Sequence, residues 1–469
     1  MSVPEEYRKV PRPKNTICKM IGDKCAVIER IGCKRVNGKN VPINGSVVGH
    51  IIDGRYVPKD RMLAITLKDY GDYAFAKSCS SDLEKQLNSI YGNIDGKRIY
   101  AMALLRCLNP ELKDYKMLEA YQSSWLSEEY KDIPMGKDSV SKYLKALGRD
   151  SLKMYQFARL RMGLSEDHTV LIDGMLKTNE SKVNSFSDFS YKGKIKGAKD
   201  ISLIIAYDFD AHEQIFAMPY PGNATDLSVC FDFIEKTGVK NCVLIGDKGM
   251  FKGETFPTGT SPFFPIKRNS KTNMELEMFK MDEVINVADG VLQCKKGYKD
   301  GYFYYSYRDL RREAKEKNDY LKSKARKGNI DQDELNKKEL RFGTVTYKTT
   351  LDISLLEAYL IYAQRWELEV NNNFYKNILD LSSVREHKDE SVIGGEMINT
   401  LAVIIGDRMK LKMAKEKVLN KDSFLGVMRR LHGFKKMLDP RNEKAWINSK
   451  RAGTDESILT ALGIKLDNV

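Results

Sequence analysis

The spacing of apolar positions changes several times along the chain, and each spacing predicts a different kind of element. In residues 1–60, short apolar runs separated by Gly and Asn predict small β-hairpins. From about 61 to 165, apolar residues recur every three or four positions, which predicts amphipathic helices. Beyond residue 166, continuous apolar runs replace this pattern and predict buried strands. The chain therefore changes from β-hairpins to helices and then to a sheet.

The strand-rich middle of the chain predicts a mixed α/β sheet. Three hairpin-connected strands come first, then a helix opening at 222–226, then two further strands. The five predicted strands are 169–173, 200–207, 214–218, 241–247 and 263–267. Two of them end in a carboxylate, Asp173 and Asp247.

Residues 269–350 interrupt this sheet. Apolar and aromatic runs at 284–287, 291–294 and 302–307 predict an antiparallel β insertion. Residues 308–341 contain 12 basic and 8 acidic side chains, which predicts a solvated helix or a flexible arm.

A long helix follows the insertion. Ser354 and Glu357 form a capping box, so the helix should begin near Leu355 and end near Asp380, before two serines. Its apolar residues predict that most sides of the helix are buried. These residues are Trp366, Leu368, Val370, Phe374, Ile378 and Leu379. An apolar helix at 394–413 and a basic tail complete the chain.

Four polar side chains of the long helix share one face. Tyr362, Arg365, Glu369 and Lys376 lie at about 0°, 300°, 340° and 320° on a helical wheel. A carboxylate between two cations suggests a metal ligand beside bound phosphates. The alternative is a salt-bridged surface stripe, since Arg365 and Glu369 are four residues apart. Glu367 falls at about 140°, far from this face, so Glu369 is the better candidate ligand.

Charge and composition indicate a globular protein with a polyanionic partner. The 469 residues include 78 Lys and Arg against 64 Asp and Glu, a net charge of +14. This excess favours nucleic acid over a membrane surface, although a merely soluble basic protein is also compatible with it. The eight cysteines form no CxxC pair and are expected to be reduced and mostly buried. Without a secretion signal or a bilayer-length apolar run, a cytoplasmic protein is expected.

The candidate chemistry lies in the three carboxylates of Asp173, Asp247 and Glu369. Together they would repel one another, and two divalent cations would resolve the conflict. Oxygen ligands suit Mg²⁺, with Mn²⁺ as a possible substitute, and two such ions promote phosphodiester cleavage. A single Asp at a strand end is more often a turn residue, which is how we interpret Asp208 and Asp210. No histidine pair has metal-ligand spacing, and no Gly-rich loop indicates ATP binding.

These residues resemble the DDE transposases of the insertion-sequence-4-like family. The family signature Tyr-x2-Arg-x3-Glu-x6-Lys is matched by Tyr362, Arg365, Glu369 and Lys376. Asp173, followed by Gly174, matches the first catalytic Asp, and Asp247, in Asp-Lys-Gly, matches the second. The resemblance covers about residues 45–465, including the long gap before the glutamate.

The resemblance implies a ribonuclease-H-like catalytic core of α/β class, interrupted by a β-rich insertion. The implied domains are an N-terminal β-hairpin region (1–60), a helical DNA-binding domain (61–165), the two core parts (166–268 and 351–400), the insertion (269–350) and a basic helical C-terminal region (401–469). Asp173, Asp247 and Glu369 would be the catalytic residues and would bind Mg²⁺, whereas Tyr362, Arg365 and Lys376 would contact DNA phosphates.

The implied activity is metal-dependent strand cleavage at transposon ends, followed by strand transfer into target DNA. The implied partners are double-stranded DNA and a second copy of the chain in a synaptic homodimer, in association with a bacterial nucleoid. The chain differs from some relatives because none of its tryptophans, Trp125, Trp366 and Trp446, lies in the insertion, which leaves a DNA hairpin step open. The alternative function is a catalytically inactive, transposase-derived DNA-binding protein.

Overall fold

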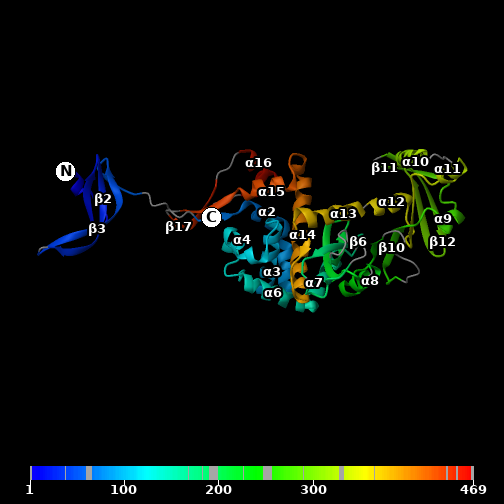
Figure 1. The fold of residues 1–469 in the computed structure, drawn as a ribbon, viewed down its shortest axis with the longest axis horizontal. Coiled ribbons are helices and arrows are strands. Elements are labelled where there is room, and N and C mark those ends of the chain that lie inside the picture. The colour runs from blue at the N-terminus through cyan, green and yellow to red at the C-terminus, as the bar shows by residue number, and fades with distance from the viewer. Residues whose placement is uncertain are drawn as a thin grey trace. The chain divides into compact units, whose positions relative to one another are not determined.

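The computed structural model describes residues 3–36, 38–59, 66–166, 168–181, 183–189, 199–224, 226–246, 256–288, 290–326, 332–363, 365–439, 442–449 and 453–465. The chain divides into two compact units. The first comprises Met1–Leu67 and Met437–Ile447, and the second comprises Lys68–Lys436 and Asn448–Asn468. Figure 1 draws the elements of both units.

The first unit contains a short helix and a four-stranded antiparallel sheet in the order β1-β2-β3-β4. The elements are α1 (Glu5–Lys9), β1 (Thr16–Ile21), β2 (Lys24–Val36), β3 (Lys39–Ile52) and β4 (Arg55–Pro58). Its small core is built on Cys25, Val27 and Ile51. The Gly and Asn turns therefore join strands in sequence order, as the alternating pattern predicts.

The second unit begins with a helical layer. Its helices are α2 (Gly71–Tyr91), α3 (Asn93–Leu108), α4 (Met117–Ser123), α5 (Leu126–Glu129), α6 (Lys137–Arg149) and α7 (Ser151–Gly163). These helices share one hydrophobic core with α14 (Asp389–Lys415), a helix of 27 residues whose middle is buried. The close approach of α6 and α14 depends on Gly148 and Gly394, because a Cβ at either position would meet the backbone of the other helix.

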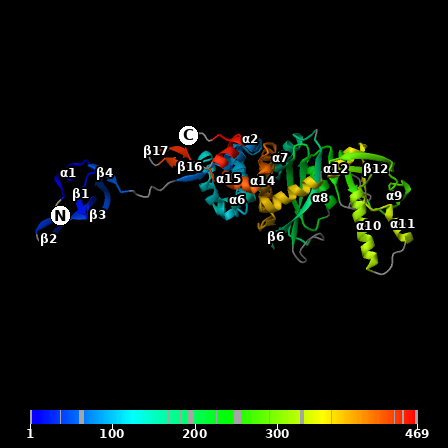
Figure 2. The same ribbon diagram turned by 90° about the horizontal axis from the view of Figure 1, so that it is seen from above.

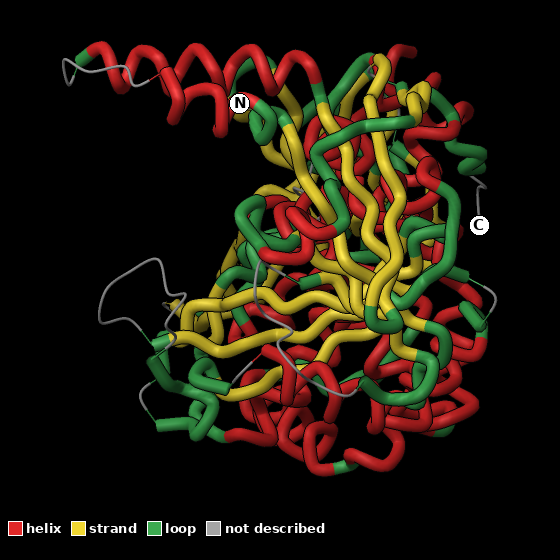
Figure 3. Tube along the Cα trace, turned by 90° about the vertical axis from the view of Figure 1, so that its right-hand side faces the viewer, coloured by secondary structure: helices red, strands yellow, loops and turns green. Residues whose placement is uncertain are grey.

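A large mixed sheet forms the centre of this unit, as the sequence predicts. Its strand order is β11-β12-β13-β14-β10-β9-β6-β7-β8, and these strands appear in yellow in Figure 3. The first strands are β6 (Val170–Asn179), β7 (Asp200–Asp208), β8 (Glu213–Pro221), β9 (Cys242–Ile245) and β10 (Thr260–Pro265), with α8 (Asp226–Thr237) between β8 and β9. β6, β7 and β8 are antiparallel, whereas β9 runs parallel to both β6 and β10.

The residues of the predicted insertion continue this sheet. They form α9 (Lys271–Glu275), β11 (Glu283–Val287), β12 (Gly290–Lys299), β13 (Tyr302–Arg308), α10 (Leu310–Ala325), α11 (Gln332–Glu339) and β14 (Thr344–Thr349). All four strands pair antiparallel with their neighbours, and β14 pairs with β10. The lysine-rich segment forms α10 and α11, which lie side by side in Figure 2 and are joined by a Lys324–Glu334 ion pair of 2.6 Å. α10 has no buried residue, so the prediction of a solvated helix is confirmed.

The long helix begins where its sequence predicts. Ser354 N–H donates to Glu357 Oε2 at 2.8 Å, and Glu357 N–H donates to Ser354 Oγ at 3.2 Å, which is a complete capping box. The described residues form α12 (Leu355–Ala363), α13 (Arg365–Asn373) and a π-helical turn (Phe374–Ile378). A short strand, β15 (Ser383–Val384), then pairs with β6.

The C-terminal region, predicted to be helical, also contains strands. After α14 come α15 (Phe424–His432), β16 (Lys435–Asp439), β17 (Asn442–Asn448) and α16 (Gly453–Ala461). β16 lies between β17 and β5 (Leu67–Asp69) in a three-stranded sheet. The sequence pattern did not predict these strands because one pairing partner lies about 370 positions away along the chain, where local periodicity carries no signal. Within the described ranges, no helix is both long and apolar enough to span a bilayer.

Candidate active site

Asp173 lies inside a strand, not at its end as the sequence predicted. β6 continues for six residues beyond Asp173 because it pairs with β7 over its whole length, from Val170–Asp208 to Thr178–Asp200. Pairing with β9 stops earlier, since its last register partner on β6 is Ile172. Asp173 is therefore the first residue of β6 beyond its ladder with β9. Its side chain is partly buried, and Oδ1 accepts a hydrogen bond from Gly174 N–H at 2.9 Å.

The second predicted carboxylate follows β9 directly. β9 ends at Ile245, and Gly246 N–H donates to Phe263 O at 3.3 Å. Asp247 lies outside the described residues, so its role stays a prediction. Because β9 and β6 are parallel and Leu244 pairs with Ile172, the chain leaves β9 at the same sheet edge where Asp173 loses its β9 neighbour.

Three of the four signature residues contact one another. Arg365 Nη1 donates to the Tyr362 hydroxyl at 3.2 Å, and Arg365 Nη2 lies 3.5 Å from Glu369 Oε1. The Tyr362 ring packs on the Tyr347 ring of β14, with centroids 4.1 Å apart. The arginine is one-third exposed and the glutamate about half exposed. This carboxylate and guanidinium are thus held together while both remain open to solvent or to a ligand.

Hydrophobic packing aligns the helix with β6. Leu368 belongs to the cluster that contains Leu171, and Phe374 belongs to the cluster that contains Met175. Leu171, Asp173 and Met175 lie on one face of β6, since alternate strand residues point the same way. The helix and β6 therefore contribute to the same two clusters in the same order along the chain. In sequence, Asp173 falls between Leu171 and Met175, and Glu369 falls between Leu368 and Phe374.

The prediction that the apolar side chains of the long helix are buried is wrong for one side of the helix. Leu368, Phe374 and Leu379 are buried against the sheet, but Trp366 is 68% exposed and Val370 is 40% exposed. The reason is that the sheet covers only one face of the helix. Apolar residues on the opposite side form an exposed stripe of Leu356, Leu360, Trp366 and Val370.

Lys376 departs from the α-helical wheel that grouped it with the other signature residues. It lies in the π-helical turn, which closes i→i+5 hydrogen bonds and so retards the phase of the residues that follow. Lys376 interacts electrostatically with Asp200, at the start of β7. Burial raises the pKa of Asp200, and the Lys376 ammonium partly offsets this rise. Its predicted contact with DNA stays a prediction.

A buried polar network fixes the π-helical turn to β6 and α14. Lys177 Nζ lies 2.5 Å from Glu396 Oε1 and donates to the Tyr375 hydroxyl at 2.8 Å, and Tyr375 donates to Glu396 Oε2 at 2.5 Å. All three side chains are almost fully buried. Burial lowers the pKa of Lys177, and Glu396 opposes that effect. This network was not predictable from the sequence, because none of its members shares a local motif with another.

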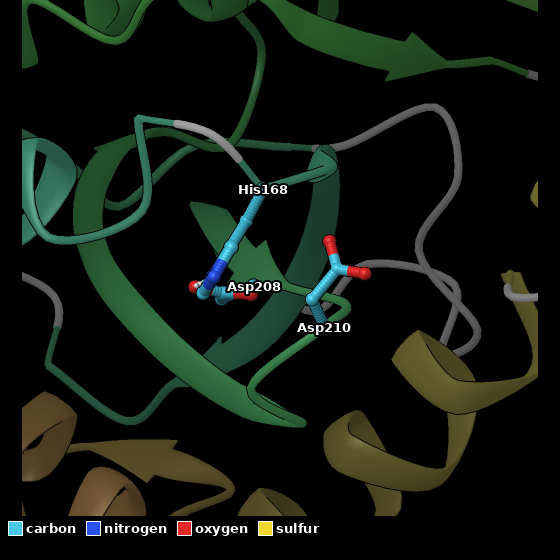
Figure 4. A group of neighbouring side chains, drawn as sticks. All are labelled: His168, Asp208 and Asp210. Carbon is cyan, nitrogen blue, oxygen red and sulfur yellow. Dashed lines mark hydrogen bonds and ion pairs between the residues drawn. The ribbon is translucent and has the colours of Figure 1, made fainter.

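An acidic cluster lies at the Val170–Asp208 end of the β6–β7 pair (Figure 4). His168, Asp208 and Asp210 offer ligand atoms that all lie within 4.8 Å of one another. Asp208 is buried, accepts from Ala211 N–H at 2.8 Å and from the Ser165 hydroxyl, and has its Oδ2 2.7 Å from His168 Nδ1. These contacts fit the interpretation of Asp208 as a turn residue. The contact of His168 with Asp208 was not predictable from local sequence, because pairing of β6 with β7 brings together residues 40 positions apart.

The donor atoms of the first site suit a hard divalent cation. Asp173 and Glu369 supply carboxylate oxygens, the ligands that Mg²⁺ and Mn²⁺ prefer. Glu369 is held by Arg365 only at 3.5 Å, so its carboxylate can exchange this contact for a metal bond. The residues present therefore fit such an ion in chemistry and exposure.

The mixed sheet and the helix that carries Tyr362, Arg365 and Glu369 define an α/β protein, and comparison with known families specifies its class. The family model described as transposase DDE domain matches residues 165–404, slightly more than half of the chain. The chain belongs to this family and is a DDE transposase. No curated protein matched the sequence. A solved structure described as a piggyBac transposase synaptic complex with hairpin DNA is 12% identical, with 77% of this chain and 78% of that chain covered and a TM-score of 0.38, a likeness that carries no argument about the site.

Proposed function

We propose that this transposase is of the insertion-sequence-4-like type and that it cuts DNA at transposon ends and joins the freed end to target DNA. The observation that supports the proposal is that the signature helix and β6 share two apolar clusters, with Asp173 and Glu369 lying in sequence between their members. Asp247, two residues beyond β9, would be the third ligand of the site. The mixed sheet with three antiparallel strands before two parallel ones supports a ribonuclease-H-like core.

In this proposal the reaction has two phosphoryl transfers. A water oxygen forms a bond to the scissile phosphorus while the bond to the 3′-oxygen breaks, which leaves a 3′-hydroxyl and a 5′-phosphate. That 3′-oxygen then attacks a target phosphodiester, loses its proton to solvent, and displaces the 3′-oxygen of the target strand. A divalent cation held by Asp173, Asp247 and Glu369 would supply Lewis-acid activation and neutralise developing charge.

The chain's own cations would orient the scissile phosphate. Arg365 lies beside Glu369 and presents a planar fork, which can hold two phosphate oxygens at once. The Tyr362 hydroxyl, which accepts from Arg365, would donate its own proton to a phosphate oxygen. The stack of Tyr362 on Tyr347 restrains this group before DNA binds.

The test is strand cleavage on linear DNA that carries the sequences flanking the gene on both sides. Cleavage that requires Mg²⁺ or Mn²⁺ and leaves 3′-hydroxyl ends is the expected result. DNA binding without cleavage under any divalent cation would instead support a catalytically inactive DNA-binding protein. Sedimentation of the DNA complex measures whether two copies of the chain act together, as the proposed synaptic homodimer requires.

A further inference from the structure

The first unit carries a two-stranded ribbon to which the catalytic proposal assigns no role. β1 pairs with β2 only as far as Glu29, and β4 pairs with β3 only from Gly49 onward. The intervening parts of β2 and β3 pair only with each other, from Arg30–Asn44 to Val36–Lys39. We call residues 30–44 the ribbon arm. Every described residue of the arm is exposed, and Figure 1 shows the paired ends of β2 and β3 in dark blue.

The arm has no core of its own. An isolated two-stranded ribbon is only marginally stable in water. The arm nevertheless exposes large aliphatic side chains, with Ile31 at 64% and Val36 at 42%. Three register shifts between Val27 and Gly32 bend the ribbon at its base, and such bulges re-aim a strand pair away from its sheet. A bound ligand that covers these aliphatic side chains would therefore stabilise the ribbon arm.

The charge of the arm selects the kind of ligand. Between Arg30 and Gly45 the sequence has four cations, Arg30, Lys34, Arg35 and Lys39, and no acidic residue. Within the described residues, none of these four side chains forms an ion pair. By contrast, four cations of α10 and α11 pair with Glu316, Glu334 and Glu339: Arg312, Lys317, Lys324 and Lys338. Unpaired cations on an exposed ribbon favour a polyanion over a second copy of a basic chain.

The register separates the arm into two chemically different faces. Arg35 lies directly opposite Asn40, and Cys33 lies opposite Pro42, on one face. Lys34 opposite Val41 and Val36 opposite Lys39 form the other face. Arg reads guanine and Asn reads adenine by paired hydrogen bonds in the major groove, which is wide enough for a two-stranded ribbon. The cross-strand Arg35–Asn40 pair therefore has the chemistry of base readout.

We infer that the ribbon arm is a DNA-reading element that lies in the major groove of duplex DNA. Arg35 and Asn40 face the base edges, whereas Arg30, Lys34 and Lys39 reach the phosphates on either side of the groove. The inference deepens the proposed function, on which it rests, by assigning recognition of duplex DNA to residues far from the catalytic carboxylates in sequence.

The first arm of the test is the salt dependence of binding by the full chain to a fluorescein-labelled 30-bp duplex of mixed sequence. Replacement of Arg30, Lys34 and Lys39 by Ala should reduce the slope of log affinity against log[KCl] by about 2–3, roughly 0.9 per lost phosphate contact. The matched control replaces Lys14, Lys19 and Lys24, three exposed lysines of the same unit outside the arm. The control removes the same charge and should change the slope by less than about 1.

The second arm of the test measures sequence readout and occupancy. Selection from a randomised duplex pool should enrich a short motif for the wild type, and Arg35→Ala should lose preference at one guanine, about 10- to 100-fold. The exposed thiol of Cys33, on the same face as Arg35, should be alkylated more than 10-fold more slowly by iodoacetamide when duplex DNA is bound. Cys18, on β1, is the internal reference.

Equal slopes for the arm and control variants, together with unprotected Cys33, would overturn the inference. Loss of dimerisation without loss of DNA affinity in the arm variant would also overturn it, in favour of contact between two copies of the chain. Different results would refute the proposed catalytic function and the proposed role of the ribbon arm. Arm-dependent binding by a protein that never cuts would refute the catalytic function alone, and normal cutting with arm-independent binding would refute only the arm.

Discussion

Asp208 of β7 and the predicted ligands Asp173 of β6 and Glu369 of α13 differ in their surroundings. Both oxygens of buried Asp208 are already satisfied, by Ala211 N–H, the Ser165 hydroxyl and the ring of His168. Asp173 is partly exposed, and Glu369 is about half exposed with an Arg365 contact of 3.5 Å. A buried carboxylate with both oxygens hydrogen-bonded has little to gain from a metal ion, whereas a solvent-accessible carboxylate can be reached by one. Proximity of acidic residues alone therefore does not identify a metal site.

The largest effect should come from the accessible carboxylates. Asp173→Ala, Asp247→Ala and Glu369→Ala should each reduce strand cleavage by about 10³-fold or more, because each removes a ligand of the metal that activates the nucleophile. DNA affinity should change little, since most of it comes from phosphate contacts elsewhere. Single-turnover cleavage with saturating protein measures the loss. Normal cleavage by Glu369→Ala together with loss in Glu367→Ala would show that the ligand on the helix is wrongly assigned.

The second-largest loss of cleavage should follow substitution of Arg365. Arg365→Ala should reduce cleavage by about 10²-fold, and Arg365→Lys should also fail substantially, because an ammonium cannot hold two phosphate oxygens in a plane. The control is Lys322→Ala on the exposed surface of α10, where a screened charge should cost less than about 2-fold. If both losses were small and equal, the Arg365–Glu369 pair would be only a surface ion pair.

A substitution in the cluster of Asp208 and His168 should lower the stability of the protein and not its cleavage activity. Asp208→Asn weakens or removes the contacts with Ser165, His168 and Ala211, and should lower the free energy of unfolding by about 2–3 kcal/mol. Thermal unfolding followed by circular dichroism measures this change. At temperatures where the variant is folded, cleavage should remain within a few-fold of the wild type. Loss of cleavage in the folded variant would give Asp208 a direct part in the reaction.

The smallest effect should be stabilisation by the metal itself. At a concentration ten times its dissociation constant, Mg²⁺ or Mn²⁺ should stabilise the folded protein by about 1.4 kcal/mol, which raises the melting temperature by a few degrees. Glu369→Ala should abolish most of this rise, whereas Asp208→Asn should keep it. The opposite pattern would locate the metal at the His168 cluster.

Local signals in the sequence were sufficient for much of the fold. The capping box at Ser354 predicted the start of α12 to the residue, and the apolar runs predicted β6 to β10 because buried strands need little beyond their own composition. β14 was missed, although Thr344–Thr349 has the β-branched and aromatic composition of a strand. The continuation of β6 beyond Asp173 was also missed, because it depends on pairing with β7.

The candidate site was predictable only in part. The spacing of Tyr362, Arg365 and Glu369 predicted their contact, since one and two helical turns bring side chains together. The same spacing argument was unreliable for Lys376, because the π-helical turn at 374–378 changes the phase and no local residue announces it. The exposure of Trp366 depends on which face of the helix the sheet covers, and that is a property of the tertiary structure.

The pairing of β14 with β10 has a consequence for how the protein can be shortened. The ladder runs without a break from β14 through β10 and β9 to β6, so the insertion and the strand of Asp173 share one hydrogen-bond network. Excision of residues 269–350 would expose β10 as a bare edge and remove Tyr347, on which Tyr362 rests. The insertion is therefore not a detachable module. Backbone amides in its strands should be protected from hydrogen exchange to the same degree as those of β6, β9 and β10.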